Sequence, residues 1–376
     1  MKRILLLLLC TLYIFCSCNR SNENDSYFKL SIIQDNIRLP LDSTMGFLSF
    51  SLQYYKDFDS NLEYICIGNH LTNTISLYNL QEPYDGKNII KLETEGANSV
   101  GITPWAFYIN NLDSIFILSH WEGLLSIVNK DGEVIYKSNL AKNTFEGDPH
   151  PWASTDQPII FNNLNKNVYV NGIIRMPLKD LMTSASTICH KLNSDSIEYL
   201  HPFPQIYSNG FWGSNNLMKV FTCQSNTSNE LIYGYAIDDS IKIGAKNILA
   251  KSKWLNAPKP YAKEFSQESD QEKLQYYEAG SGCYSALIAD PYRGLYYRLV
   301  QHEISREEFN QGKIRADFSI IVLDDQFKNL GEFKLPAELS SLMYVLTPTG
   351  LHFANEKSYK SNENYLSFDQ IEFIQK

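Results

Sequence analysis

The sequence predicts an all-β protein, a β-propeller of six four-stranded blades. Short segments rich in β-branched and aromatic residues, each ended by Asn, Gly, Asp or Ser, follow one another along the whole chain. This is the pattern of strands joined by turns. Helical periodicity is nearly absent. The segments add up to about 24 or 25 strands, spread evenly in recurring groups of four, which is the signature of a propeller.

The recurring group is clearest at residues 107–138, which read FYINNLDSIFILSHWEGLLSIVNKDGEVIYKS. Residues 284–335 repeat the order of strand, short turn, strand, hairpin, strand, acidic turn and strand. With one insertion set aside, about 320 residues divided over six blades give roughly 53 residues per blade. Seven blades would give about 46 residues each, closer to the roughly 40–45 residues of a WD40 repeat. Strands for a seventh blade are not found, so six is the prediction and seven the weaker alternative.

A ring needs its first and last blades joined, and the sequence offers a strand for this. The segment YFKLSII at residues 27–33 precedes the first full group, and the last group, at residues 342–374, is short. Pairing them would remove an exposed strand edge, which is otherwise an aggregation liability. We expect residues 27–376 to form one propeller domain closed by its N-terminal strand. A helical insertion is expected near residues 257–280, and a long hairpin loop with one helical turn at residues 305–313.

The first residues resemble the signal of a bacterial lipoprotein. Lys2 and Arg3 precede an apolar run at residues 4–15. This run is too short to span a bilayer, because a spanning helix needs roughly 20 apolar residues, and it fits a secretory signal. Cys18 follows a small residue at the end of the run, as in a lipobox. The lipobox usually has small residues before its cysteine and an aliphatic residue further back, whereas here these positions hold Cys16, Ser17 and Phe15.

This resemblance implies that residues 1–17 are a lipoprotein signal peptide and that Cys18 carries the lipid as the first mature residue. The alternative is an ordinary cleaved signal with an incidental cysteine. Residues 18–26 are polar and predict a flexible tether. We therefore expect a protein of the cell envelope, lipid-anchored to the outer membrane. No later segment is apolar enough to cross a membrane.

The charge balance excludes nucleic acid as a partner. The chain has 33 Lys and Arg against 42 Asp and Glu, and loss of residues 1–17 leaves 31 basic residues and a charge of −11. No run of Lys or Arg forms a basic patch. The membrane is expected as a partner only through the lipid, and the remaining candidates are a glycan, a peptide or an envelope protein.

The four cysteines beyond the signal region are predicted to be buried free thiols. Three of them lie in apolar strand-like segments, where cysteine packs like a small apolar residue, and no two form a CxxC pair. Disulfides are the alternative in an exported protein, with three possible connectivities. The seven histidines are scattered without metal-ligand spacing, so neither a metal nor a cofactor is predicted. The four cysteines are Cys66, Cys189, Cys223 and Cys283.

Two segments suggest residues that could bind a ligand at a mouth of the ring. In GDPHPWAST, at residues 147–155, two prolines flank His150 and Trp152 follows. The two prolines could hold the side chains of His150 and Trp152 rigidly at the mouth of the ring, or they could merely stiffen a connection between blades. In DPYRGLYYRLVQHE, at residues 290–303, Tyr296 and Arg298 share one face of a strand.

Arg298 could then clamp a carboxylate in the central channel, because its guanidinium matches a carboxylate with two hydrogen bonds. The alternative pairs Arg293 or Arg298 with Asp290 or Glu303 to fix the blade. Tyr and Trp combine a flat apolar face with a polar edge, which suits sugar or peptide binding, although most aromatic residues must pack between blades. The candidate ligand-binding residues are Trp121, His150, Trp152, Arg175, Trp212, Tyr296 and Arg298.

Sequence motifs of enzymes are missing. The chain has no GxSxG, P-loop, GxGxxG followed by a helix, or SxxK arrangement. A binding or interaction module with its ligand at one mouth of the channel is therefore expected. The alternatives are a hydrolase or lyase for glycans or peptides, using carboxylates or His150 at that mouth, and an assembly part whose flat face docks another envelope protein.

Four segments resemble an uncharacterised family of Bacteroides-type lipoproteins, the domain of unknown function 4221, which is similar to TolB-like six-bladed propellers. They are VGITPWAFYINNLDSIFILS at residues 100–119, DPYRGLYYRLVQHE at 290–303, FSIIVLDDQFKNLGEFKLP at 318–336 and LTPTGLHFAN at 346–355. The resemblance covers nearly the whole mature chain. It implies fold and location only, because the family brings no established activity.

Overall fold

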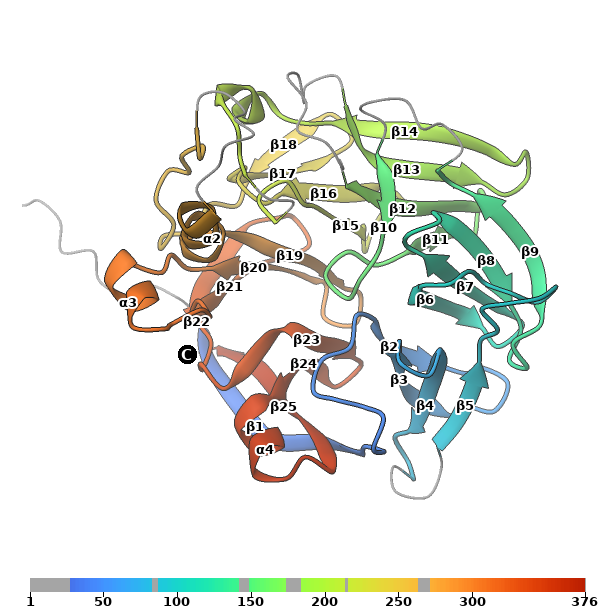
Figure 1. Ribbon diagram of the computed structural model, residues 1–376. Helices are drawn as coiled ribbons and strands as arrows, with labels where there is room; N and C mark the ends of the chain where they lie inside the picture. Colours follow the sequence, from blue (N-terminus) through green and yellow to red (C-terminus); the bar gives the residue numbers. More distant parts are fainter. Residues whose placement is uncertain are drawn as a thin grey trace, which may run out of the picture.

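The computed structural model describes residues 28–82, 87–141, 149–173, 184–213, 216–262 and 271–375. The predicted signal peptide, the lipidation at Cys18, the tether and Arg175 lie outside these residues. The described strands form six antiparallel sheets, which Figure 1 shows arranged as the blades of a ring. The predicted six-bladed propeller is therefore confirmed.

The blades take their strands in chain order from the innermost outward, except that blade 6 is completed by β1. Blade 1 is β2 (Leu52–Lys56), β3 (Glu63–Asn69), β4 (Thr74–Asn79) and β5 (Lys87–Lys91). Blade 2 is β6 (Pro104–Asn111), β7 (Ser114–Ser119), β8 (Leu124–Val128) and β9 (Val134–Asn139). Blade 3 is β10 (His150–Trp152), β11 (Ile160–Asn162), β12 (Asn167–Ile173), β13 (Ala185–Lys191) and β14 (Ser196–Pro202).

The second half of the ring follows the same order. Blade 4 is β15 (Val220–Gln224), β16 (Leu231–Tyr235), β17 (Ser240–Ile243) and β18 (Lys246–Leu249). Blade 5 is β19 (Cys283–Asp290), β20 (Leu295–Gln301), β21 (Phe318–Leu323) and β22 (Asn329–Lys334). Blade 6 is β23 (Leu339–Thr347), β24 (Gly350–Asn355), β25 (Tyr365–Gln375) and β1 (Phe28–Pro40).

Short helices occupy some of the connections. They are η2 (Gln205–Asn209), α2 (Gln271–Gly280), α3 (Arg306–Asn310) and α4 (Glu356–Ser361). Helix α3 is the helical turn predicted within residues 305–313. It begins at a capping box, in which Ser305 Oγ accepts from Glu308 N at 3.2 Å and Glu308 Oε2 accepts from Ser305 N at 3.0 Å.

Strand β1 closes the ring, as the sequence predicted. It pairs antiparallel with β25 as the outermost strand of blade 6, so the first and last described strands lie side by side (Figure 1). We call the face where the innermost strands begin the upper face and the opposite one the lower face. Register pairing places Ile32 of β1 level with Leu346, next to the end of β23. Phe28, where the described chain begins, therefore lies at the lower face.

The apolar core is divided among the junctions between neighbouring blades. Five clusters of buried apolar side chains each join two adjacent blades: 1 with 2, 2 with 3, 4 with 5, 5 with 6 and 6 with 1. Within the described residues, blades 3 and 4 meet through buried hydrogen bonds. Thr222 Oγ1 donates to Asn171 Oδ1 at 3.1 Å, and the hydroxyls of Ser186 and Tyr235 lie 3.0 Å apart.

The four cysteines in the described part of the chain are buried and free, as the sequence predicted. Burial raises the pKa of each thiol, to about 11 for Cys189 and about 12 for Cys283. These thiols are therefore protonated at neutral pH and act as small apolar side chains.

Candidate functional site

Blade 3 differs from the others because its innermost strand is split. Strands β10 and β11 both pair with β12, and residues 153–159 leave the sheet between them. Thr155 N donates to Phe50 O of blade 1 at 2.9 Å, and Tyr344 Oη of blade 6 donates to Thr155 O at 3.3 Å. Lys219, directly before β15 of blade 4, binds Asp156 with 2.9 Å between Nζ and Oδ2. We call residues 153–159 the crossing segment, because they reach from blade 3 to three other blades.

The crossing segment separates two cavities on the ring axis. The upper cup, of about 570 Å³, is lined by the starts of the innermost strands and the loops before them. The lower chamber, of about 460 Å³, is lined by residues of the innermost strands of all six blades. Thr155 lines both cavities. The upper cup is thus a blind depression.

The side of the upper cup formed by blades 1 to 3 is aromatic. Phe50, His70 and Trp152 line it. Phe50 stacks on Trp105 with ring centroids 4.9 Å apart and 9° between the planes, and Trp152 stacks on His120 at 4.2 Å and 22°. Burial lowers the pKa of His120 to about 4, so this ring is neutral at pH 7. Trp105 and His120 lie behind the cup lining and fix the rings in front of them.

The side formed by blades 4 to 6 and the crossing segment is mainly polar. The ion pair of Asp156 and Lys219 lies here, and Ser154 Oγ donates to Asp156 Oδ1 at 2.5 Å. Ser341 adds a hydroxyl group from blade 6, whereas the Ser285 hydroxyl oxygen is buried. The upper cup therefore faces flat aromatic rings with hydrogen-bonding groups, an arrangement that suits a ligand with an apolar face and polar edges.

Three of the predicted ligand-binding residues lie at or near the upper cup, and Trp152 lines it. His150 is buried behind the cup, where its Nε2 is hydrogen-bonded to the carbonyl of His120. Trp121 lies in the β7–β8 turn on the same face, 63% exposed, with its backbone N donating to Thr103 Oγ1 at 3.1 Å. Trp121 does not belong to the described lining of the cup.

The predictions for Trp212, Tyr296 and Arg298 need correction, because these side chains are at most 1% exposed. Trp212 Nε1 donates to Tyr207 O at 3.2 Å within the core. Tyr296 stacks on Phe327 and its hydroxyl accepts from the backbone of blade 4. Tyr296 and Arg298 are therefore closed to a ligand, and Trp212 borders another cavity of about 400 Å³ instead of the upper cup.

Arg298 joins blade 5 to blade 4 instead of pointing along the channel. Its Nη1 donates to the carbonyls of Asp239 and Ala250, each at 3.0 Å. Its Nη2 donates to those of Tyr235 and Asp238. The guanidinium carbon also lies 3.3 Å from the centre of the Tyr284 ring. Burial lowers the pKa of Arg298 to about 10, which leaves it charged at neutral pH.

Arg293, rather than Arg298, forms the pair with an acidic residue that the alternative interpretation expected to fix a blade. Its Nε donates to Oδ2 of the fully buried Asp290 at 2.6 Å, and Tyr297 Oη donates to the same oxygen at 2.8 Å. Arg293 also donates to Thr347 O and Pro348 O of blade 6, at 3.1 and 2.9 Å. This arginine joins blades 5 and 6.

Sequence reasoning missed most of the residues that form the upper cup. Phe50 and His70 flank strands of blade 1, and Lys219 directly precedes β15. Each stands just before or just after a strand of the structure, and nearness to a strand end is the signal that could have found them. No local motif connects them, because Asp156 and Lys219 are 63 residues apart in the chain.

The described residues contain neither a metal-ligand cluster nor a membrane-spanning helix. No group of three or more His, Cys, Asp or Glu side chains there is placed to hold a metal ion. No helix among these residues has the length and apolar character needed to cross a membrane.

The fold and the cup define the class of this protein, a six-bladed β-propeller whose axis is obstructed by its own third blade. The chain belongs to the family described as Domain of unknown function (DUF4221), whose model matches residues 27–334. This confirms the family that the sequence resembled. Among curated proteins, none matches the chain.

Two solved structures from Bacteroides are similar to this protein. One is a member of the DUF4221 family from Bacteroides vulgatus ATCC 8482, with 19% sequence identity, a TM-score of 0.73, and coverage of 93% of this chain and 99% of that one. The other is a "Putative exported protein" from Bacteroides fragilis NCTC 9343, with 10% identity, a TM-score of 0.54, and coverage of 95% and 98%. At these identities the similarity shows the fold alone.

Proposed function

We propose that this protein is a ligand-binding module of the cell envelope, anchored to the outer membrane by a lipid on Cys18, and that its upper cup binds a glycan. The observation that carries the proposal is the blind cup, with aromatic rings on one side and hydrogen-bonding groups on the other. Its volume of about 570 Å³ lies within the range of about 300–1,000 Å³ that is usual for ligand sites. A sugar ring offers the complementary apolar face and polar edge.

The position of Phe28 indicates how the upper cup would be oriented relative to the membrane in this proposal. The described chain begins at the lower face, and residues 18–27 span at most about 35 Å when fully extended. A lipid on Cys18 would therefore hold the lower face nearer to the membrane. The upper cup would open away from the membrane, toward ligands that arrive from solution.

The alternative of a hydrolase or lyase has no specific observation in its favour. Among the described residues that line the cup, Asp156 is the one carboxylate, and it is paired with Lys219. Glycoside hydrolysis generally uses two carboxyl groups about 5–9.5 Å apart. His150, the other candidate, lies behind the cup. We therefore argue the binding function.

Trp152→Ala is expected to weaken glycan binding about tenfold or more, because it removes the aromatic face that the sugar covers. Binding would be found on an array of neutral and acidic oligosaccharides and measured by titration calorimetry. Trp121→Ala is the matched control, since it removes the same side chain from the same face outside the cup. Its affinity is expected to equal that of the wild type.

Three results would contradict this proposal. One is equal binding by the wild type and Trp152→Ala. Another is a wild-type protein that binds no oligosaccharide of the array. The third is binding to a peptide library but to no glycan, which would replace the ligand class.

Cys18→Ala is expected to move the protein from the membrane fraction to the soluble fraction, because the lipid has lost its attachment atom. Globomycin, which blocks cleavage of lipoprotein signals, is expected to accumulate the longer precursor of the wild type. Cys16→Ala is the matched control and should fractionate like the wild type, since residue 16 is removed with the signal. Unchanged fractionation of Cys18→Ala would exclude the lipid anchor.

A further inference from the structure

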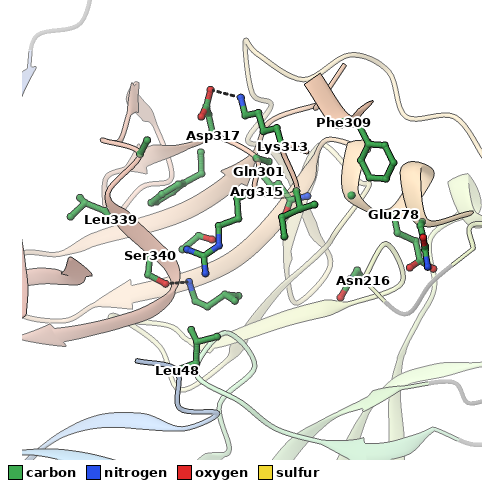
Figure 2. Close-up of a pocket in the computed structure, with 18 residues that line it drawn as sticks. Leu48, Asn216, Glu278, Gln301, Phe309, Lys313, Arg315, Asp317, Leu339 and Ser340 are labelled. Carbon is green, nitrogen blue, oxygen red and sulfur yellow. Dashed lines mark hydrogen bonds and ion pairs between the residues drawn. The ribbon is translucent and has the colours of Figure 1, made fainter. Parts of the chain in front are cut away.

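A second cavity opens beside the upper cup, and we call it the notch. Its volume is about 680 Å³, compared with about 570 Å³ for the cup. Figure 2 shows Phe309 and Glu278 on one side of the notch and Leu339 and Ser340 on the other, with Gln301 between them. The notch therefore lies between the helices inserted around blade 5 and the start of blade 6.

Helices α2 and α3 form a braced wall of the notch. Helix α2 precedes blade 5, and α3 lies in the β20–β21 connection of the same blade. The rings of Tyr276 and Phe309 pack with centroids 5.3 Å apart, and Arg306 Nη2 lies 2.5 Å from Glu272 Oε1. Because each helix supports the other, the wall is formed before any ligand arrives.

The notch and the upper cup adjoin each other. Gln275 and Ala279 of α2 line the outer end of the notch, and Phe50 and Trp152 line the far side of the cup. The two neighbouring cavities together thus reach from the ring axis to the α2 wall. Five residues line both cavities: Leu48, Asn216, Gln301, Ser341 and Leu342.

The charges of the notch are balanced. Two basic residues, Lys313 and Arg315, line it together with two acidic residues, Glu278 and Asp317. Lys313 Nζ lies 3.5 Å from Asp317 Oδ2, and Arg315 forms an ion pair with Glu356 of α4. Such a surface attracts neither strongly acidic nor strongly basic chains, and it offers many donors and acceptors. It suits a neutral chain rich in hydroxyl groups.

A peptide fits the notch less well than a glycan. Peptides commonly bind by adding a strand to an exposed sheet edge, which needs regular backbone pairing. The strand that borders the notch is irregular there, because the register of β23 with β24 shifts between Leu339 and Tyr344. Contacts in the notch would therefore come from side chains, as glycan binding requires.

We infer that the ligand is a neutral, linear oligosaccharide, with one end in the upper cup and the following sugars in the notch. This inference rests on the proposed function of the cup. A cavity of about 300–1,000 Å³ accommodates one drug-sized ligand, so two adjoining cavities accommodate a longer chain. Sugars bound in the two cavities act as linked ligands, and the affinity rises with chain length until both are filled.

The test measures binding of neutral oligosaccharides of increasing length to the full chain by titration calorimetry. In the wild type, the affinity is expected to rise about tenfold or more from trisaccharide to hexasaccharide. Ala279→Trp fills the notch from the α2 wall at a position that does not line the cup. It is expected to abolish this gain and to leave trisaccharide affinity within about twofold of the wild type. Ala337→Trp fills the notch from the opposite wall and serves if the first variant does not fold.

Lys273→Trp is the matched control, because Lys273 lies exposed on the same helix and outside the described notch lining. It should keep the wild-type dependence on length. Equal wild-type affinity for trisaccharide and hexasaccharide would overturn the notch inference and leave the cup proposal standing. Absence of binding to every oligosaccharide would overturn the proposed function itself.

Discussion

A chain that begins at Leu41, and so lacks β1, is expected to lose its cooperative fold. Strand β1 pairs with β25 over ten register positions, buries Leu39 completely and packs the half-buried Leu30 and Ile32 into the core of blades 5 and 6. Full burial of one such side chain contributes about 1.5–3 kcal/mol. Because a whole domain is stable by only about 5–15 kcal/mol, the loss of the strand removes stabilisation of the same order as the total.

Self-association should accompany the loss of stability, because β25 becomes an exposed strand edge. Thermal unfolding followed by circular dichroism and size-exclusion chromatography would measure both effects, with a chain beginning at Phe28 as the control. A synthetic peptide of residues 28–40 should restore the monomer, whereas a scrambled peptide should not. A monomeric chain beginning at Leu41 with an unchanged Tm would contradict closure by β1.

Arg298→Ala is expected to lower the free energy of unfolding by about 3–5 kcal/mol, although this residue lies outside the upper cup. The change removes the arginine donor from four carbonyl oxygens of blade 4, of which those of Tyr235 and Asp239 keep a backbone N–H donor. A buried polar group left unsatisfied costs about 1–3 kcal/mol, and these remaining donors, with relaxation of the neighbouring chain, keep the total below the sum of four such losses. Urea unfolding at neutral pH would measure the difference.

Two further variants separate the role of the planar guanidinium from that of charge. Arg298→Lys keeps the charge but reaches fewer carbonyls, so it should recover only part of the lost stability. Arg306→Ala removes an exposed arginine of the same blade and should change stability by less than about 1 kcal/mol. Wild-type stability in Arg298→Ala would show that the guanidinium does not hold blades 4 and 5 together.

The architecture could be predicted because strand patterns are local. Alternation within residues 107–138 marked four strands that the structure places in blade 2, and the spare segment at residues 27–33 identified the closing strand. The same alternation correctly put Tyr296 and Arg298 on one face of β20. Alternation could not predict whether that face of β20 meets the channel or the neighbouring blade, because this depends on how the blades pack. In the structure, the face packs against blade 4.

The upper cup was harder to predict, because its parts come from distant stretches of chain. Trp152 was found through its unusual proline-rich setting. The sequence does not reveal that the residues after it leave the sheet, since PWASTDQP reads as an ordinary turn between strands. Asp156 and Lys219 form their ion pair in the cup only because the fold brings the crossing segment against blade 4. The local spacing of apolar residues carries no information about contacts between segments that are distant in the chain.

Because β1 pairs with β25, the ring can close, and so become resistant to proteases, only after β25 has been synthesised. Phe28 belongs to the earliest strand of the propeller to be synthesised, and its partner Gln375 belongs to the latest. Pairing between residues so far apart in sequence forms slowly and needs both segments to be present. A chain cut short before β25 therefore keeps unpaired edges at both ends of the ring. Only a chain that contains β25 can hide them, so closure distinguishes chains with both strands from chains that lack one.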